Sequence, residues 1–471
     1  MYCHKNIGCI SNYLKAIMGM AVWLFVNISV YGQSKPNIIL LMADDLGWGD
    51  VGFNGNPFIK TPELDKMSMN SIQFTRFYSA SPVCSPTRGS CLTGRNPERY
   101  GIHFANVGSL KAEEITLAEV LKKKGYTTGH FGKWHLGTLS KTIPDGHRGG
   151  KEKEIAYYSP PWENGFDTCF STEQAVPTWN PMKEQTIKTK YWGGPGKFAT
   201  ENLEGDDSRI IMDRALTFIE QAVKNKSPFL SVIWFHAPHT PVVAGPQYLA
   251  MYPGFDENHQ HYFGCITAMD EQIGRLRREL KLLKIAENTI IFFASDNGPA
   301  GEGGGILQYP GQRQQGSAGL FRGRKGSLYE GGIRVPALLE WPARFKMHRK
   351  FDVSVSTNDY FPSILSLLGY KPEGNKYPLD GTNIFELIEQ NRPKRLKPIG
   401  FRLYKQRAYI DGQYKIYSSN DGIHYELYDL LNDPYETSDI ASSQSDRVDT
   451  MKAALEVWID SCIKSEKGED Y

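Results

Sequence analysis

The sequence has few cysteines for a chain whose first residues look like an export signal. It contains seven in 471 residues, and Cys3 and Cys9 precede an apolar run at residues 16–30. Removal of this N-terminal segment would leave an odd and sparse set of five: Cys84, Cys91, Cys169, Cys265 and Cys462. Such a set argues against a disulfide framework, and at least one thiol needs another explanation.

The sequence also lacks an excess of charge of either sign. It has 54 Lys and Arg residues against 52 Asp and Glu residues, a formal net charge of +2. Because so balanced a chain is not drawn to nucleic acid by its overall field, we expect no nucleic-acid partner. Any preference for an anionic substrate must come from a local cluster of cations. Internal repeats and low-complexity tracts are absent from the sequence as well.

The N-terminus predicts a signal peptide at residues 1–32. Lys5 and Lys15 supply positive charge around the start of the apolar run, and Val30-Tyr31-Gly32 offers a cleavage site before Gln33. The run is shorter than the ~20 apolar residues of a comfortable membrane span. We therefore expect a secreted or periplasmic protein with no stable membrane span after cleavage. An uncleaved N-terminal anchor is the alternative.

Strand and helix patterns alternate over most of the chain. Apolar runs predict buried strands at 37–43, 228–235 and 289–294, with a shorter strand at 126–131. Amphipathic patterns predict helices at 116–124, 208–223 and 262–284. This alternation is typical of an α/β domain with a large, mixed but mainly parallel sheet between helices. We assign this domain to residues 33–374.

The pattern changes towards the C-terminus. Residues 299–326 have little periodicity and predict a long loop, which in a compact domain is usually functional or disordered. Short strands separated by turn residues then follow at 398–404, 406–411, 414–418 and 425–429, before a helix at 444–463. Residues 375–471 are therefore expected to form a smaller subdomain with an antiparallel sheet and a helix.

Two polar pairs directly follow predicted strands. Asp44 and Asp45 come after the first strand, and Asp296 and Asn297 come after the strand at 289–294. In open parallel sheets, binding sites gather beyond the carboxyl ends of the strands. Three carboxylates at one edge would repel one another unless cations pair with them, and these oxygen ligands suit Ca²⁺ or Mg²⁺. For either pair alone, a turn or helix cap is the simpler interpretation.

A second feature is the run Cys84-Ser85-Pro86-Thr87-Arg88, followed by Leu92-Thr93-Gly94-Arg95. Here the chain resembles the sulfatase family, whose signature is Cys-x-Pro-x-Arg with a Leu-Thr-Gly-Arg stretch. The resemblance implies an alkaline-phosphatase-like fold. It also implies that a maturation enzyme oxidises Cys84 to formylglycine, which would account for one unpaired cysteine. A buried free cysteine near a turn is the alternative.

The resemblance extends through three further motifs and a C-terminal run. Phe131-Gly132-Lys133-Trp134-His135-Leu136-Gly137 supplies Lys133 and His135. His236-Ala237-Pro238-His239-Thr240-Pro241 supplies His239, and Lys325 lies in the Gly323–Gly332 stretch. The run from Leu427 to Glu436 resembles the smaller domain of the family.

The resemblance also implies a catalytic mechanism. One Ca²⁺ would be held by Asp44, Asp45, Asp296, Asn297 and residue 84. Arg88, Lys133 and Lys325 would neutralise the sulfate in a site that excludes water. One hydroxyl of the formylglycine hydrate would attack sulfur while His239 protonates the leaving alcohol. His135 would then take the proton of the second hydroxyl, and the sulfated hemiacetal would collapse to aldehyde and sulfate.

The substrate is less constrained by the sequence. We expect a sulfated carbohydrate, such as a glycosaminoglycan or algal polysaccharide fragment. Trp162, Trp179 and Trp192 lie in an irregular region, where they could contact sugar rings or simply pack. Two alternatives remain for the function: a phosphodiesterase or phosphonate hydrolase of the same superfamily, and a non-catalytic carbohydrate-binding homologue.

Overall fold

A computed structural model of the protein describes residues 35–183, 185, 188–300, 313, 315–370 and 377–470. Residues 36–471 form one compact unit. The predicted signal peptide lies outside the described residues, and so do residues 374 and 375 at the predicted domain boundary, which therefore stays a prediction. Within the described part of the chain, no helix is long and apolar enough to cross a membrane.

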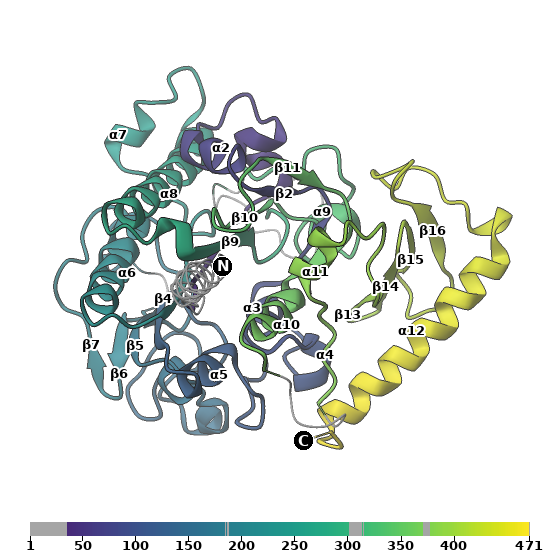
Figure 1. The fold of residues 1–471 in the computed structure, drawn as a ribbon, viewed down its shortest axis with the longest axis horizontal. Helices are drawn as coiled ribbons and strands as arrows, with labels where there is room; N and C mark the ends of the chain where they lie inside the picture. Colours follow the sequence, from purple (N-terminus) through teal and green to yellow (C-terminus); the bar gives the residue numbers. More distant parts are fainter. Residues whose placement is uncertain are drawn as a thin grey trace, which may run out of the picture. The chain divides into compact units, whose positions relative to one another are not determined.

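Ten strands of the described chain form one large sheet, in the order β11-β2-β10-β9-β1-β8-β4-β5-β6-β7 (Figure 1). The five central neighbours from β9 to β5 are parallel, whereas β10 is antiparallel to both β9 and β2. The bounds of the strands are β1 Asn37–Ala43, β2 Ile72–Phe74, β4 Thr127–Lys133, β5 Thr168–Thr172, β6 Trp192–Gly194, β7 Lys197–Phe198, β8 Phe229–Trp234, β9 Thr289–Ser295, β10 Ala337–Glu340 and β11 Arg349–Phe351. The predicted mixed, mainly parallel sheet is confirmed.

Both faces of the sheet are buried, which explains the continuous apolar runs of its central strands. Ile38 and Leu40 of β1 belong to one core cluster, and Ile39 and Leu41 belong to the other. Helices α6 and α8 contribute to the second cluster, whereas α3, α5, α10 and α11 contribute to the first. The helices of this part are α2 Pro62–Ser68, α3 Cys84–Thr93, α4 Pro97–Tyr100, α5 Leu117–Lys123, α6 Asp207–Lys224, α7 Pro246–Leu249, α8 Glu257–Leu282, α9 Glu330–Ile333, α10 Tyr360–Leu367 and α11 Ile384–Glu389.

The C-terminal part carries a second sheet of four described strands in the order β13-β14-β15-β16, paired antiparallel throughout. Its elements are β13 Ile399–Leu403, β14 Gln406–Asp411, β15 Tyr414–Ser418, β16 Glu426–Asp429 and the helix α12 Ser445–Glu466. Figure 1 shows α12, in yellow, running along this sheet, which it contacts at β13, β14 and β15. A two-stranded sheet pairs β3 Phe77–Tyr78 with β12 Val355–Ser356. The predicted antiparallel sheet and terminal helix are confirmed.

The predicted elements agree with the structure to within a few residues, with one informative difference. Helix α8 begins at Glu257 instead of residue 262, because Asp256 caps it by accepting hydrogen bonds from the backbone N–H groups of Asn258 and His259. This first turn is polar and carries no apolar periodicity. In the predicted loop at 299–326, the described residues contain no helix and only an isolated bridge at residue 315, while residues 301–312 and 314 lie outside the described part.

Candidate active site

Four adjacent parallel strands, β9, β1, β8 and β4, end at the same edge of the large sheet. Asp296 and Asn297 follow β9, Asp44 and Asp45 follow β1, and a loop with His239 follows β8. Strand β4 ends at Lys133, two residues before His135. Because Ala43 is in register with Ser295, the two predicted polar pairs leave the sheet side by side. The sheet therefore brings together residues more than 250 positions apart.

The acidic residues form a connected and buried group at this edge. The backbone N–H of Asp45 donates to Oδ1 of Asp296 (3.1 Å), and Nδ2 of Asn297 donates to Oδ1 of Asp45 (2.7 Å). Asp45 has a φ of 69°, in the left-handed region that Asp tolerates better than most residues. Non-glycine residues in this conformation concentrate at functional sites.

Three buried cations balance the three carboxylates. Nζ of Lys133 lies 2.7 Å from Oδ2 of Asp44, and Nζ of Lys325 lies 2.6 Å from Oδ1 of Asp45. The guanidinium of Arg88 donates to Oδ2 of Asp296 from Nε (3.1 Å) and Nη2 (2.6 Å), and its Nη1 donates to the backbone oxygen of Lys133 (3.0 Å). All six predicted charged residues thus meet in one site, where Arg88 binds the carboxylate of Asp296.

The acidic group fits a hard divalent cation. Burial and then the charge of Asp44 raise the pKa of Asp296 to about 7. Burial opposes ionisation of Asp44 too, but the charges of Lys133 and Arg88 hold its pKa well below the usual value. Two buried acceptors, Oδ1 of Asp44 and Oδ1 of Asn297, have no hydrogen-bond partner in the structure. Hard oxygens left open between carboxylates are the ligands that Ca²⁺ and Mg²⁺ prefer.

Cys84 is the first residue of α3 and lies beside this group. A ligand atom from each of Asp44, Cys84 and Asp296 falls within 4.8 Å of the others. The five described cysteines are all buried and free of disulfide bonds. Burial raises the pKa of the Cys84 thiol, so an unmodified thiol would stay protonated at neutral pH. A protonated thiol is a poor nucleophile.

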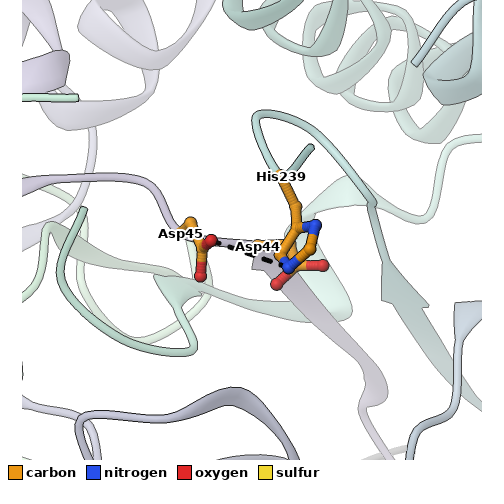
Figure 2. A group of neighbouring side chains, drawn as sticks. All are labelled: Asp44, Asp45 and His239. Carbon is orange, nitrogen blue, oxygen red and sulfur yellow. Dashed lines mark ion pairs between the residues drawn. The ribbon is translucent and has the colours of Figure 1, made fainter. Parts of the chain in front are cut away.

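The two predicted histidines each have one ring nitrogen held and the other available. His239 points towards the two aspartates (Figure 2): its Nδ1 donates to the backbone oxygen of Thr240 (2.6 Å), and its Nε2 lies 3.8 Å from Oδ2 of Asp45. Nε2 of His135 bonds Oδ1 of Asn106 (3.0 Å), while its Nδ1 is buried without a partner. Burial lowers the pKa of His239 to about 4 and, together with Lys133 and Arg88, lowers that of His135 well below its usual value. Both rings are therefore neutral in the free site.

Sequence reasoning missed Asn106, which fixes the orientation of His135. It lies in an irregular loop with a φ of 61°, and no motif marks it.

The choice of His239 over His236 agrees with the contacts, because His236 is fully buried between Asp207 and Thr172. The structure favours packing for the three candidate tryptophans: Trp192 is fully buried, and Trp162 and Trp179 pack against the cores.

A mainly parallel sheet of the alkaline-phosphatase-like kind, with acids and cations gathered at its strand ends, defines the class of the protein as a hydrolase. The Sulfatase family model matches residues 36–370, and the model of the N-sulphoglucosamine sulphohydrolase C-terminal region matches residues 316–461. The chain therefore belongs to the sulfatase family and is a sulfuric ester hydrolase.

Individual relatives agree with this assignment. N-acetylgalactosamine-6-sulfatase of Rattus norvegicus is 33% identical over 400 residues, covering 81% of this chain and 71% of that enzyme. The ulvan-active sulfatase of Formosa agariphila is 30% identical over 441 residues, covering 86% and 77% of the two chains. The crystal structure of Ps i-CgsB in complex with k-i-k-neocarrahexaose has a TM-score of 0.76 at 29% identity, with 90% of this chain and 93% of that chain covered.

Proposed function

We propose that this sulfatase is an exported enzyme that removes sulfate from a sulfated carbohydrate, such as a glycosaminoglycan or algal polysaccharide fragment. Its nucleophile would be formylglycine made from Cys84, and its metal would be one Ca²⁺. The observation that carries the proposal is the convergence of Cys84, three carboxylates and three cations at one strand edge.

The metal site would consist of Asp44, Asp45, Asp296, Asn297 and residue 84. The open oxygens of Asp44 and Asn297 support this assignment, since a bound cation would satisfy both. When bound, Ca²⁺ supplies positive charge that polarises the sulfate oxygens. The protein holds four of these ligands at the ends of the adjacent strands β1 and β9 and residue 84 at the start of α3, which is a rigid support for a metal site.

Residue 84 is well placed to act on a sulfate held against this edge. The formylglycine hydrate supplies one hydroxyl as nucleophile and a second hydroxyl that allows the sulfated residue to release its sulfate. Residue 84 also begins a ten-residue helix, and the positive end of the helix dipole favours an anion there. The raised pKa of the unmodified thiol gives a physical reason why cysteine itself would serve poorly.

The three cations divide between substrate and scaffold. Lys133 and Lys325 each place an ammonium group at the carboxylate edge, where it can also donate to an anion, so we assign them to the sulfate oxygens. Arg88 is fully buried, and its guanidinium bonds Asp296 and the backbone oxygen of Lys133. We therefore assign Arg88 to holding the metal ligand and the β4 end in position.

The histidines suit opposite proton transfers. Because Nε2–H of His135 donates to Asn106, the lone pair lies on Nδ1, and a neutral ring in this tautomer can accept a proton. The free Nε2 of His239 faces Asp45, where the charge of a bound sulfate favours its protonation. We assign His239 as the general acid for the leaving alcohol and His135 as the base for the second hydroxyl.

Relatives support a carbohydrate substrate without selecting one. The names of those that resemble this chain refer to N-acetylgalactosamine and ulvan, and one structural relative was solved with a neocarrahexaose. A panel of sulfated N-acetylgalactosamine, ulvan oligosaccharides and carrageenan oligosaccharides should show sulfate release from at least one. Release from 4-nitrophenyl sulfate but from none of a broad set of sulfated sugars would contradict the carbohydrate assignment.

The phosphonate hydrolase alternative has one structural parallel. Phosphonate monoester hydrolase of Agrobacterium radiobacter superposes with a TM-score of 0.61 at 18% identity, a likeness that concerns the fold alone. Rates on 4-nitrophenyl sulfate and on an aryl phosphate diester, measured with the same preparation, separate the two activities. We expect the sulfate ester to be the better substrate; a strong preference for the diester would contradict the proposal.

A further inference from the structure

Two clefts of similar size open on the described part of the molecule, and they differ in position. One, of about 650 Å³, is lined by Thr127 and Thr168 at the amino ends of β4 and β5, at the opposite edge of the sheet from the site. The other, of about 640 Å³, has a lining that includes residues 48–50, 54–59, 317, 319–321 and 435. The second shares its segments with the active site, because Asp45 precedes Trp48 by three residues and Lys325 follows Phe321 by four.

The floor of the second cleft is built from those two segments bonded together. The backbone N–H of Gly49 donates to the oxygen of Ser317 (2.9 Å), and the N–H of Ser317 donates to Oδ1 of Asp50 (2.8 Å). A Cβ on Gly47 would lie 2.1 Å from the oxygen of Ser317, so the close approach requires glycine there. The floor is thus fixed relative to the metal ligand Asp45 on one segment and Lys325 on the other.

The walls of this cleft carry exposed aromatic rings. Phe58 is 56% exposed and Tyr435 is 39% exposed, and Tyr435 packs against Phe321 with 5.8 Å between ring centroids. Phe321 in turn meets the edge of Trp48 at 5.0 Å and the guanidinium of Arg334 at 4.4 Å. Large apolar rings left exposed in a cleft mark a binding surface, and flat rings match the C–H faces of sugars. The cleft is also within the usual size of ligand sites.

The course of the chain links the cleft to the active site. His239, the proposed general acid, and Lys325 both approach the carboxylate of Asp45, and the chain runs from Asp45 into the Trp48 segment of the cleft. We propose that the cleft of Trp48, Phe58, Phe321 and Tyr435 binds sugar units next to the sulfated one, an inference that rests on the proposed function. The substrate is then a chain, and these rings determine a preference for longer oligosaccharides.

The test compares a small and a long substrate in matched variants. Phe58→Ala and Tyr435→Ala remove exposed rings of the cleft, and Phe198→Ala removes a ring of similar exposure (42%) from the other cleft. Each enzyme is assayed on 4-nitrophenyl sulfate and on disaccharides and hexasaccharides of chondroitin 6-sulfate and of carrageenan. We expect the wild type to prefer a hexasaccharide. Each cleft variant should lose roughly three- to tenfold in kcat/KM on the hexasaccharide, which corresponds to about 0.7–1.4 kcal/mol.

The controls separate this inference from the proposed function. Rates on 4-nitrophenyl sulfate should stay unchanged in all three variants, and Phe198→Ala should keep the hexasaccharide preference. Equal rates on short and long substrates in the wild type, or equal losses on both substrates in the cleft variants, would overturn the inference and leave the sulfatase intact. A protein that hydrolyses no sulfate ester would instead overturn the proposed function.

Discussion

Two buried ionic clusters in this protein use similar residues for different ends. One is the strand edge with Asp44, Asp45 and Asp296. The other joins Lys415 of β15 to Glu330 and Glu436: its Nζ lies 3.1 Å from Oε1 of Glu330 and 2.8 Å from Oε1 of Glu436. All these side chains are almost completely excluded from solvent. Each cluster holds an acid whose pKa burial raises to about 7, Asp296 in the first and Glu436 in the second.

The clusters differ in how completely their oxygens are used. In the second, every carboxylate oxygen lies within 3.3 Å of a donor atom: Tyr78 and Arg334 contact Glu330, the N–H of Glu330 donates to Glu436, and Lys415 pairs with Oε1 of Glu436 at 2.8 Å without hydrogen-bond geometry. In the first, Oδ1 of Asp44 lies 3.5 Å from the guanidinium of Arg88 and accepts no hydrogen bond, and Oδ1 of Asn297 accepts none either. The second cluster therefore pairs its carboxylates within the protein, and we call it the closed cluster. The first leaves Oδ1 of Asp44 and Oδ1 of Asn297 for a bound ligand, and we call it the open cluster.

The largest effect should come from the nucleophile beside the open cluster. Cys84→Ala should reduce turnover by roughly 10⁴- to 10⁶-fold, because loss of a catalytic nucleophile removes most of the rate enhancement. Turnover of 4-nitrophenyl sulfate and thermal unfolding would be measured together. Cys91→Ala, a buried cysteine in the same helix, should keep most activity. Substantial activity in Cys84→Ala would rule out residue 84 as the nucleophile.

The open cluster should depend on metal, and the closed one should not. Asp296→Ala should lose both bound Ca²⁺ and activity, because the remaining carboxylates can no longer complete the site. Elemental analysis and assay after chelation and Ca²⁺ readdition provide the measurement. Glu436→Gln, at the acid with a similarly raised pKa, should retain metal and kcat. Zinc as the only metal found, or full metal binding by Asp296→Ala, would contradict the ligand assignment.

The two histidines at the open cluster should respond differently to the leaving group. A sugar alcohol needs a proton as its bond to sulfur breaks, whereas nitrophenolate needs one much less. His239→Ala should therefore lose ~10²–10⁴-fold more on a sulfated sugar than on 4-nitrophenyl sulfate. His135→Ala should slow both substrates and accumulate sulfated enzyme after a burst of the first product. Equal losses on both substrates for His239→Ala would remove its role as general acid.

The smallest catalytic effect should come from the closed cluster. Lys415→Met removes the cation that the buried Glu330 and Glu436 share and should lower the free energy of unfolding by about 3–5 kcal/mol. The kcat of the folded fraction should stay near the wild-type value. Urea unfolding with parallel assays would check this, and Lys66→Met, in an exposed pair with Glu63, should change stability little. A large fall in kcat with unchanged stability would reverse the comparison between the clusters.

Much of the open cluster could be predicted from sequence, because its residues follow apolar strands or lie in recognisable motifs. Parallel strands end at the same edge of a sheet, which predicts that the pairs at 44–45 and 296–297 lie together. The register of β1 and β9 confirms that they do. Asn106 could not be found, since its role depends on where an irregular loop passes His135. The closed cluster was equally hidden: Glu330 and Lys415 lie 85 residues apart in unrelated segments. Such contacts depend on tertiary packing, which short sequence patterns do not encode.

The most direct test of the formylglycine nucleophile is mass spectrometry of the peptide that contains residue 84, taken from enzyme active on a sulfate ester. We expect an aldehyde, or its hydrate, in place of the Cys84 thiol, and a specific activity that rises with the converted fraction. An enzyme of full activity whose residue 84 is an unmodified cysteine would contradict it.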